Sequence, residues 1–404
     1  YIPEWGGDLR GNITLRAVMQ MSSGLKPDQF SFSPFSRTIE YFMGSDVEAV
    51  TLATEYEQEP GLEFQYSSGN SQLLGIVLER ATGKTLAEYE SERLWKPLGA
   101  DDASLFLDRE GGMARTFCCF HTTARGWLRL GIMLANRGVA QDGRQVVDPA
   151  WLAQWTMPAP TNPQYGMQVW LGADFVGDRS YHRYTTLSVP HQEPIEADDM
   201  FYFDGAVGNR LYVIPSKELV IVRTGLNTAE WEESFIPNTL IRGIKDDAGN
   251  DDTANGDEVQ ASAEIPEDDT VFWNRFNNLP EDIMEAPTAW YDPVEPIAGA
   301  TTPVEFAAVD QPVISADAIA EAERFAKANN STALVVLYDG KLAHEVYWDG
   351  YSRDTEFSSH SMVKTLTGLA VATAQADVFI HSFDDPVSTY LPEAAGRPFA
   401  DRTI

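Results

Sequence analysis

Residues 333–374 constrain the fold of this chain more than any other part of the sequence. Two apolar runs, 333–338 and 342–347, flank an Asp-Gly pair, and this combination is a strong signal of a β-hairpin. A run of good helix formers then begins near Ser361, and a helix that starts there puts Ser361 and Lys364 one turn apart on the same face. The sequence therefore predicts a hairpin followed by a helix whose first turn carries a hydroxyl and an amine.

A serine at the start of a helix beside a lysine is suited to nucleophilic catalysis. Unpaired backbone N–H groups and the positive helix end favour a developing anion at Ser361. The Lys364 amine can accept the hydroxyl proton if burial lowers its pKa. The alternative is a serine in the first turn of a buried helix, because this spacing occurs by chance about once or twice in a chain of this length. A second copy, Ser23-Gly-Leu-Lys26, is disfavoured because Gly24 and Pro27 oppose a helical turn there.

Charge and cysteine content exclude several function classes. The net charge of -32 disfavours nucleic acid and anionic membrane surfaces as partners, and no run is apolar enough to span a membrane. Cys118 and Cys119 are adjacent, and because neighbours rarely form a disulfide we interpret both as small core residues. The six histidines have no metal-ligand spacing, and no phosphate-binding or dinucleotide fingerprint is present. We therefore expect a soluble protein without metal or cofactor, while the sequence leaves the compartment unknown, either the bacterial periplasm or the cytoplasm.

The remaining pattern predicts a mixture of helices and strands. Helices are expected at 14–21, 71–83, 85–94, 122–136, 149–155, 230–244 and 316–329, and further strands at 165–171, 200–203, 210–214 and 219–224. Residues 246–269 are rich in acidic residues and lack Lys and Arg, which indicates a solvated linker. Residues 270–314 contain several prolines and are expected to be loop-like.

Several motifs together resemble one family of enzymes. They are Ser361-x-x-Lys364, Tyr390-Leu-Pro-Glu393, the stretch 13–24 that ends in Met-Ser-Ser-Gly, the Tyr66-Ser67 turn and Pro97-Leu-Gly99. This set resembles the serine hydrolases related to class C β-lactamases, penicillin-binding carboxypeptidases and family VIII esterases, with the 6-aminohexanoate-dimer hydrolase branch nearest. The resemblance implies an α/β (α+β) fold of the β-lactamase/transpeptidase type, a mainly antiparallel sheet flanked by helices plus a helical region.

The motifs occur in a permuted order relative to that family. The family order is restored when residues 316–404 are placed before residues 12–244, which predicts a circularly permuted fold. Residues 1–245 then form the C-terminal part of the hydrolase fold, 246–269 the acidic linker and 270–404 the N-terminal part, together one hydrolase domain. Residues 390–404 also resemble residues 1–13. This repeat leaves open whether the chain is one permuted protein or a slice of two tandem repeats, and whether a homodimer or half-exchanged assembly forms.

The resemblance also implies roles for individual residues. Ser361 would be the acylated nucleophile, Lys364 its proton acceptor, and Tyr66 a second acid or base that acts as a tyrosinate beside a lysine ammonium. The backbone N–H groups of Ser361 and Ala206 would form the oxyanion hole. Substrate-binding or supporting roles are expected for Ser68, Asn70, Phe203, Asp204, Gly205 and His360. Simpler interpretations make Tyr66 a turn aromatic that covers the core and His360 a bystander.

Position 203 bears on the substrate class. Phe203 stands where the family has a cation that helps to hold a substrate carboxylate. The leading expectation is therefore a serine hydrolase acting on small-molecule esters or linear amides through an acyl-enzyme. A β-lactamase or D-Ala-D-Ala-type peptidase is the second reading, and a β-lactamase-like binding or assembly module without catalysis is the third.

Overall fold

A six-stranded antiparallel sheet forms the centre of the fold, with strand order β11-β10-β8-β7-β6-β3. The computed structural model describes residues 2–28, 36–172, 174–185, 187–226, 231–244, 270–280 and 286–388. The strands are β3 (Trp170–Leu171), β6 (Phe201–Gly205), β7 (Asn209–Ile214), β8 (Leu219–Gly225), β10 (Ser331–Tyr338) and β11 (Lys341–Tyr347). Both predicted hairpins, β7–β8 and β10–β11, are confirmed, and they join side by side through β8 and β10.

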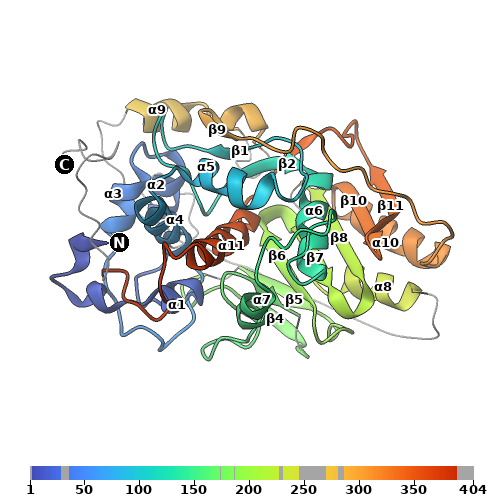
Figure 1. Cartoon of the computed structure of the whole chain (residues 1–404), viewed down its shortest axis with the longest axis horizontal. Coiled ribbons are helices and arrows are strands. Elements are labelled where there is room, and N and C mark those ends of the chain that lie inside the picture. The colour runs from blue at the N-terminus through green and yellow to red at the C-terminus, as the bar shows by residue number, and fades with distance from the viewer. Residues whose placement is uncertain are drawn as a thin grey trace.

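Side chains alternate between the two faces of this sheet, and helices cover both faces. Val222 and its partner Val335 belong to the same core as helices α4, α6 and α11, whereas Ile221 and its partner Val336 face helices α8 and α10. Figure 1 shows α8 and α10 together at one end of the sheet, as predicted for the helices near 230–244 and 316–329. The bounds are α4 (Ser68–Thr82), α6 (Ala124–Ala135), α8 (Phe235–Gly243), α10 (Ala316–Ala328) and α11 (Met362–Ala376). Burial on both faces explains why β8 and β10 read as continuous apolar runs.

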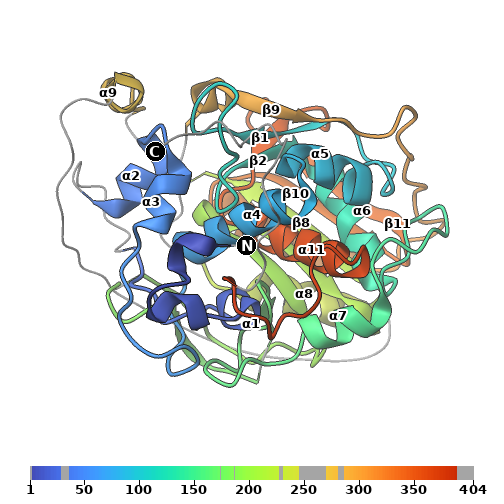
Figure 2. The same ribbon diagram turned by 60° about the vertical axis from the view of Figure 1, so that its left-hand side comes forward.

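Helix α11 lies in the middle of the molecule, between the sheet and the N-terminal helices (Figures 1 and 2). It packs against α4 and the end of β6. The chain beyond it returns to the N-terminal segment, where Thr14 forms a β-bridge with Pro386 and the Ile2 N–H donates to the Val387 carbonyl at 2.8 Å. Segments that are far apart in the sequence therefore complete one core around α11.

A second, four-stranded antiparallel sheet was not predicted from the sequence. Its order is β12-β2-β1-β9, with β1 (Ala103–Phe106), β2 (Phe120–Thr123), β9 (Val294–Ile297) and β12 (Glu356–Ser358). The expectation that residues 270–314 are loop-like is wrong, because this region supplies both β9 and helix α9 (Thr270–Asn277). Strand β9 contains Pro296 and stands beside β1 at the end of the strand order in the described residues, which is the edge position where a proline is tolerated.

The other expected elements are present with shifted ends. Three further helices match predictions: α1 (Leu15–Met19), α5 (Leu86–Glu90) with the π turn Ser91–Trp95, and α7 (Pro149–Trp155). Four elements were not predicted: α2 (Arg37–Met43), α3 (Val47–Leu52), β4 (Gly177–Ser180) and β5 (Ser188–His191). Short 3-10 helices are η1 (Pro3–Trp5), η2 (Leu9–Asn12), η4 (Ala206–Gly208), η5 (Pro215–Lys217) and η7 (Thr288–Tyr291). The strand expected at 165–171 shrinks to β3, because the backbone turns at Gln168 with a φ of 66°. Helix α6 begins late because Thr123 ends β2 and caps the helix.

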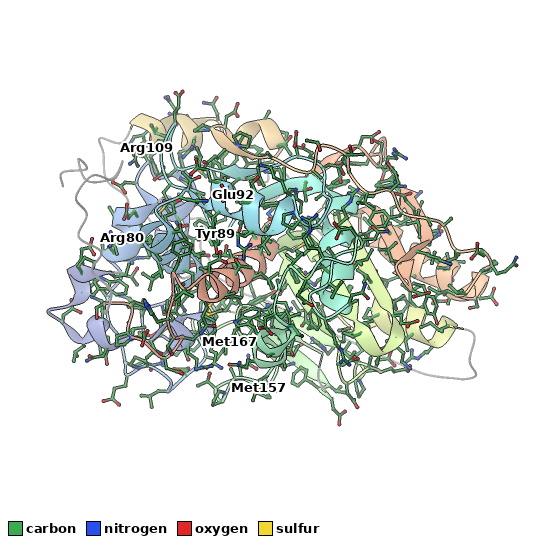
Figure 3. The ribbon with its side chains drawn as sticks, viewed as in Figure 1. Arg80, Tyr89, Glu92, Arg109, Met157 and Met167 are labelled. Carbon is green, nitrogen blue, oxygen red and sulfur yellow. A yellow bond between two sulfur atoms is a disulfide. The ribbon has the colours of Figure 1, made fainter. Side chains whose placement is uncertain are left out.

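Ion pairs brace the helical region around α4. Arg80, labelled in Figure 3, lies near the end of α4 and reaches both Glu4 and Glu48 at 2.8 Å. The three side chains are partly exposed, so each pair contributes at most about 1 kcal/mol. These contacts hold the C-terminal end of α4, whose opposite end faces α11.

The adjacent cysteines differ from expectation in one respect. Cys118 and Cys119 are buried as predicted, but they form a disulfide with each other, contrary to the expectation for neighbouring cysteines. The acidic stretch 246–269 and the motif at 390–393 lie outside the described residues. Among the residues described, none of the helices has the length and apolar character that a membrane crossing would need.

Candidate active site

Ser361 stands at the N-terminal end of α11, where the helix begins as predicted. It occupies the N-cap position with φ -67° and ψ -7°, yet its hydroxyl does not cap a helix N–H group. The preceding residue, His360, has a φ of 46°, a left-handed conformation that costs free energy for a residue other than glycine. This turn carries the chain from β12 into α11 and leaves the Ser361 hydroxyl available to a neighbouring side chain.

Lys364 is the neighbour that engages this hydroxyl. Its Nζ donates to Ser361 Oγ at 2.8 Å and to the Phe117 carbonyl at 3.2 Å, and it lies 4.9 Å from the centre of the Tyr66 ring. Burial lowers the pKa of Lys364 to about 8, while the negative charges of Asp28 and Asp204 oppose the decrease. A substantial fraction of the amine is therefore neutral in mildly alkaline solution, which allows it to accept a proton.

Tyr66 reaches the same serine from the turn before α4. Its backbone N–H donates to the Tyr181 carbonyl at 3.0 Å, and its hydroxyl hydrogen-bonds the Ser361 side chain. Burial raises the pKa of Tyr66 well above 10, and the nearby Tyr165 and Asp204 raise it further, although the bond to Ser361 opposes them. The expected tyrosinate is therefore disfavoured, and Tyr66 is a neutral phenol at neutral pH.

Asp28 belongs to this site, but the sequence analysis did not predict a role for it. It is buried and accepts hydrogen bonds from Ser67 Oγ at 2.5 Å and from the Ser68 N–H at 3.1 Å, so it fixes the turn that carries Tyr66. It is also the first negative charge that raises the pKa of Lys364 against burial. Its place four residues beyond the Met-Ser-Ser-Gly motif was the only available signal, and that position alone does not indicate a contact with α11.

The end of β6 closes against the start of α11, and Gly205 makes this approach possible. A Cβ at position 205 would lie 2.5 Å from the Ser359 carbonyl oxygen and 3.1 Å from Met362 Cγ. Asn209 reinforces the contact, because its side-chain amide donates to the Ser358 carbonyl at 3.0 Å. Ala206 follows directly as the first residue of η4. The geometry thus brings the backbone of Gly205 beside the turn that precedes Ser361.

Phe203 and Asp204 point to opposite faces of β6, and only Asp204 lies toward the site. Phe203 is fully buried and packs against the rings of Trp127 and Trp155, so its expected supporting role is wrong. Asp204 accepts hydrogen bonds from the Tyr181 hydroxyl at 2.7 Å and from Arg179 at 2.8 Å. Arg210 also pairs with it, at 2.7 Å. Asp204 is therefore held in a buried network of charges whose other acid is Glu233.

The remaining predicted residues lie around the site, and in the described part of the chain none of them hydrogen-bonds Lys364. The Asn70 side-chain oxygen Oδ1 accepts from Ser23 Oγ at 2.7 Å, and Asn70 Nδ2 donates to the sulfur of Met21 at 3.5 Å. Ser68 is the first residue of α4, with its backbone bound to Asp28. His360 is buried beside the cysteine pair. Ser23, as predicted, is not in a helical turn with Lys26.

Comparison with known proteins supplies the family. The family model described as Beta-lactamase matches residues 1–237 and 316–404. The 6-aminohexanoate-dimer hydrolase of Paenarthrobacter ureafaciens is 30% identical over 165 residues, which cover 38% of this chain and 41% of that protein. The D-aminopeptidase of Brucella anthropi is 33% identical over 75 residues, 16% of this chain and 14% of that protein. The chain thus spans less than half the length of these relatives.

The family match extends over far more of the chain than the matches to single relatives. It includes the segment with Ser361 and Lys364 and the segment with Tyr66. Both parts of the match follow the chain order, so it shows the family without showing a permuted arrangement. Because the matched segments together make up well over half of the chain, this protein belongs to the beta-lactamase family.

Proposed function

We propose that this protein is a serine hydrolase that cleaves carboxylic esters or small linear amides through an acyl-enzyme on Ser361. The observation that carries the proposal is the 2.8 Å hydrogen bond from Lys364 Nζ to Ser361 Oγ, with the Tyr66 hydroxyl bonded to the same serine. Ser361 is partly exposed, whereas Lys364 and Tyr66 are buried behind it. A substrate can therefore reach the hydroxyl while the two proton-transfer groups stay shielded from water.

The proposed chemistry starts with neutral Lys364 as the general base. It takes the Ser361 proton while Oγ attacks the carbonyl carbon, and the Phe117 carbonyl and the charge of Asp28 favour the resulting ammonium. Tyr66 donates its phenolic proton to the leaving group and recovers one from Lys364. The N–H groups of Ser361 and Ala206 stabilise the tetrahedral oxyanion, and each such donor is worth roughly 3–4 kcal/mol. Water then releases the acyl group by the same steps in reverse.

The site side of β6 supports a neutral substrate rather than one with a carboxylate, because the residue that lies there is the acid Asp204. The neighbouring cations Arg179 and Arg210 are buried in ion pairs with Asp204 and Glu233. Relatives named as a dimer hydrolase and an aminopeptidase agree with hydrolysis in general. A β-lactamase or D-Ala-D-Ala-type peptidase remains the second candidate, because the family match favours it.

We expect kcat/KM for a short-chain p-nitrophenyl ester to exceed that for the β-lactam nitrocefin. The preference should reach at least about 10- to 100-fold, because a hydrogen bond to a charged group contributes about 1.5–3 kcal/mol and the substrate carboxylate of nitrocefin would lack one. Steady-state rates on both substrates measure the preference. Equal or reversed values would replace the esterase or amidase proposal by the β-lactamase one.

A labelling experiment tests the proposal against a non-catalytic binding module. An active-site-directed phosphonate should add one phosphonyl group per chain, and peptide mass spectrometry should locate it on Ser361. A folded chain that takes up no label, and that turns over neither ester nor β-lactam, would favour the binding module instead.

We further propose that residues 270–404 form the N-terminal part and residues 1–245 the C-terminal part of one permuted hydrolase domain, joined by the acidic linker 246–269. Support comes from the pairing of β8 with β10 and from the Val387 carbonyl, which accepts from the Ile2 N–H at 2.8 Å. A chain reordered so that residues 270–388 lead through a short Gly-Ser link into residues 2–245 should fold and hydrolyse the ester at a comparable rate. Circular dichroism and ester turnover check this, and a reordered chain that stays unfolded would contradict it.

A further inference from the structure

The chain from Phe117 to Phe120 runs directly along the nucleophile turn. At one end, the Phe117 carbonyl accepts from Lys364 Nζ at 3.2 Å. At the other, Phe120 exchanges two hydrogen bonds with Ser359, from the Ser359 N–H at 2.8 Å and to Ser359 Oγ at 2.9 Å. The Cys118–Cys119 pair lies between these two anchors. Any rearrangement of the pair is therefore transmitted to the groups on either side of Ser361.

A histidine completes a cluster of potential metal ligands with these cysteines. Both Sγ atoms and a ring nitrogen of His360 lie within 4.8 Å of one another, and all three residues are buried. Tetrahedral zinc with two thiolates and one imidazole holds its ligand atoms roughly 3.5–3.8 Å apart. The two sulfur atoms are bonded to each other here, so they must separate after reduction to reach that spacing. Two thiolates and an imidazole suit thiophilic divalent cations. Sequence spacing could not reveal this cluster, because the histidine and the cysteines lie in different halves of the chain.

We propose that Cys118, Cys119 and His360 bind one thiophilic divalent cation of the Zn²⁺ and Cd²⁺ class when the disulfide is reduced, and that binding inhibits hydrolysis at Ser361. Reduction breaks the S–S bond and consumes two electrons and two protons. A phosphine supplies the electrons and becomes a phosphine oxide, while water supplies the protons. The cation then displaces the two thiol protons. This site departs from the expectation of a protein without a metal.

Inhibition follows from the position of the three ligands. His360 directly precedes Ser361, so an imidazole drawn toward the metal moves the turn that presents the hydroxyl. The cysteines follow Phe117, whose carbonyl holds the Lys364 amine, so their movement also disturbs the general base. The inhibition rests on the proposed hydrolase function, whereas metal binding itself does not.

The test is a Cd²⁺ titration of the full chain, with and without prior reduction by a phosphine. The reduced chain should bind one Cd²⁺ with thiolate-to-metal charge-transfer absorption, and the unreduced chain should show none. Cys118 and Cys119 are the only two cysteines, so the absorption has one possible source. Ester turnover should fall on loading and return after chelation.

Single variants assign the ligands. Cys118→Ala and Cys119→Ala should each lose the absorption, and His360→Ala should weaken Cd²⁺ binding by more than about 100-fold, because even an outer-shell partner is typically worth 10- to 100-fold. His381→Ala, which changes an exposed histidine beyond the far end of α11, should bind as the parent chain does. Absent absorption in the reduced, folded parent chain, or unchanged affinity in His360→Ala, would overturn the site. Unchanged ester turnover in the loaded chain would overturn the inhibition, while failure of the unloaded chain to hydrolyse esters would reject only the hydrolase proposal.

Discussion

Replacing Ser361 by alanine is expected to abolish ester hydrolysis while leaving the fold intact. Loss of the nucleophile in a serine hydrolase lowers kcat by about 10⁶-fold, because no covalent intermediate can form. The hydroxyl caps no helix N–H group, so its removal should cost little stability. Turnover of a p-nitrophenyl ester and the midpoint of thermal unfolding measure the two effects separately.

Ser352→Ala is a suitable control for this variant. Ser352 is exposed and lies in the turn before β12, where its hydroxyl contacts only Thr355 and the Asp354 N–H among the described residues. It should hydrolyse the ester at the parent rate. If Ser361→Ala kept parent turnover, the nucleophile would have to be another residue and the proposed mechanism would be wrong.

Removing the Lys364 amine or the Tyr66 hydroxyl should each lower kcat by about 10²- to 10⁴-fold, the usual contribution of a positioned acid or base. Lys364→Met and Tyr66→Phe are preferred because both keep the buried volume. The double variant should lose less than the product of the single effects, because both groups act on the same serine. Steady-state kcat values for the four chains measure this coupling.

The pH profile separates the two roles. Neutral Lys364 is the active form, so kcat/KM should fall as the pH drops through the lowered pKa of about 8. This acidic limb should persist in Tyr66→Phe and disappear from the residual activity of Lys364→Met. The exposed residues Lys96 and Tyr184 supply matched controls, as Lys96→Met and Tyr184→Phe. If the effects of the two substitutions on kcat were fully additive, Tyr66 would only line the site and would take no part in proton transfer.

Local signals in the sequence were sufficient to predict helix α11 and both hairpins. The spacing of Ser361 and Lys364 fixes their relation within one helical turn, whatever surrounds them. Groups that reach the site only through tertiary packing have no recognisable spacing in the sequence. Asp28 and the Phe117 carbonyl contact the site only because α4 and the chain before β2 pack against α11.

Strand alternation explains the error at Phe203. Successive side chains in a strand point to opposite faces, so Phe203 and Asp204 could not both have lined the site. The motif comparison aligned the residue but did not say which face it occupied. Prolines contributed to another miss, because those in residues 270–314 argued against a strand, yet β9, which contains Pro296, is an edge strand.

The pairing of β8 with β10 has a consequence for how the chain is made. Strand β8 leaves the ribosome about a hundred residues before β10, a delay of roughly 5–20 s at ordinary rates of synthesis. During that interval its apolar edge has no partner strand, and such edges are templates for aggregation. Until β10 is made, this edge of β8 is therefore the part of the sheet most exposed to pairing with another chain.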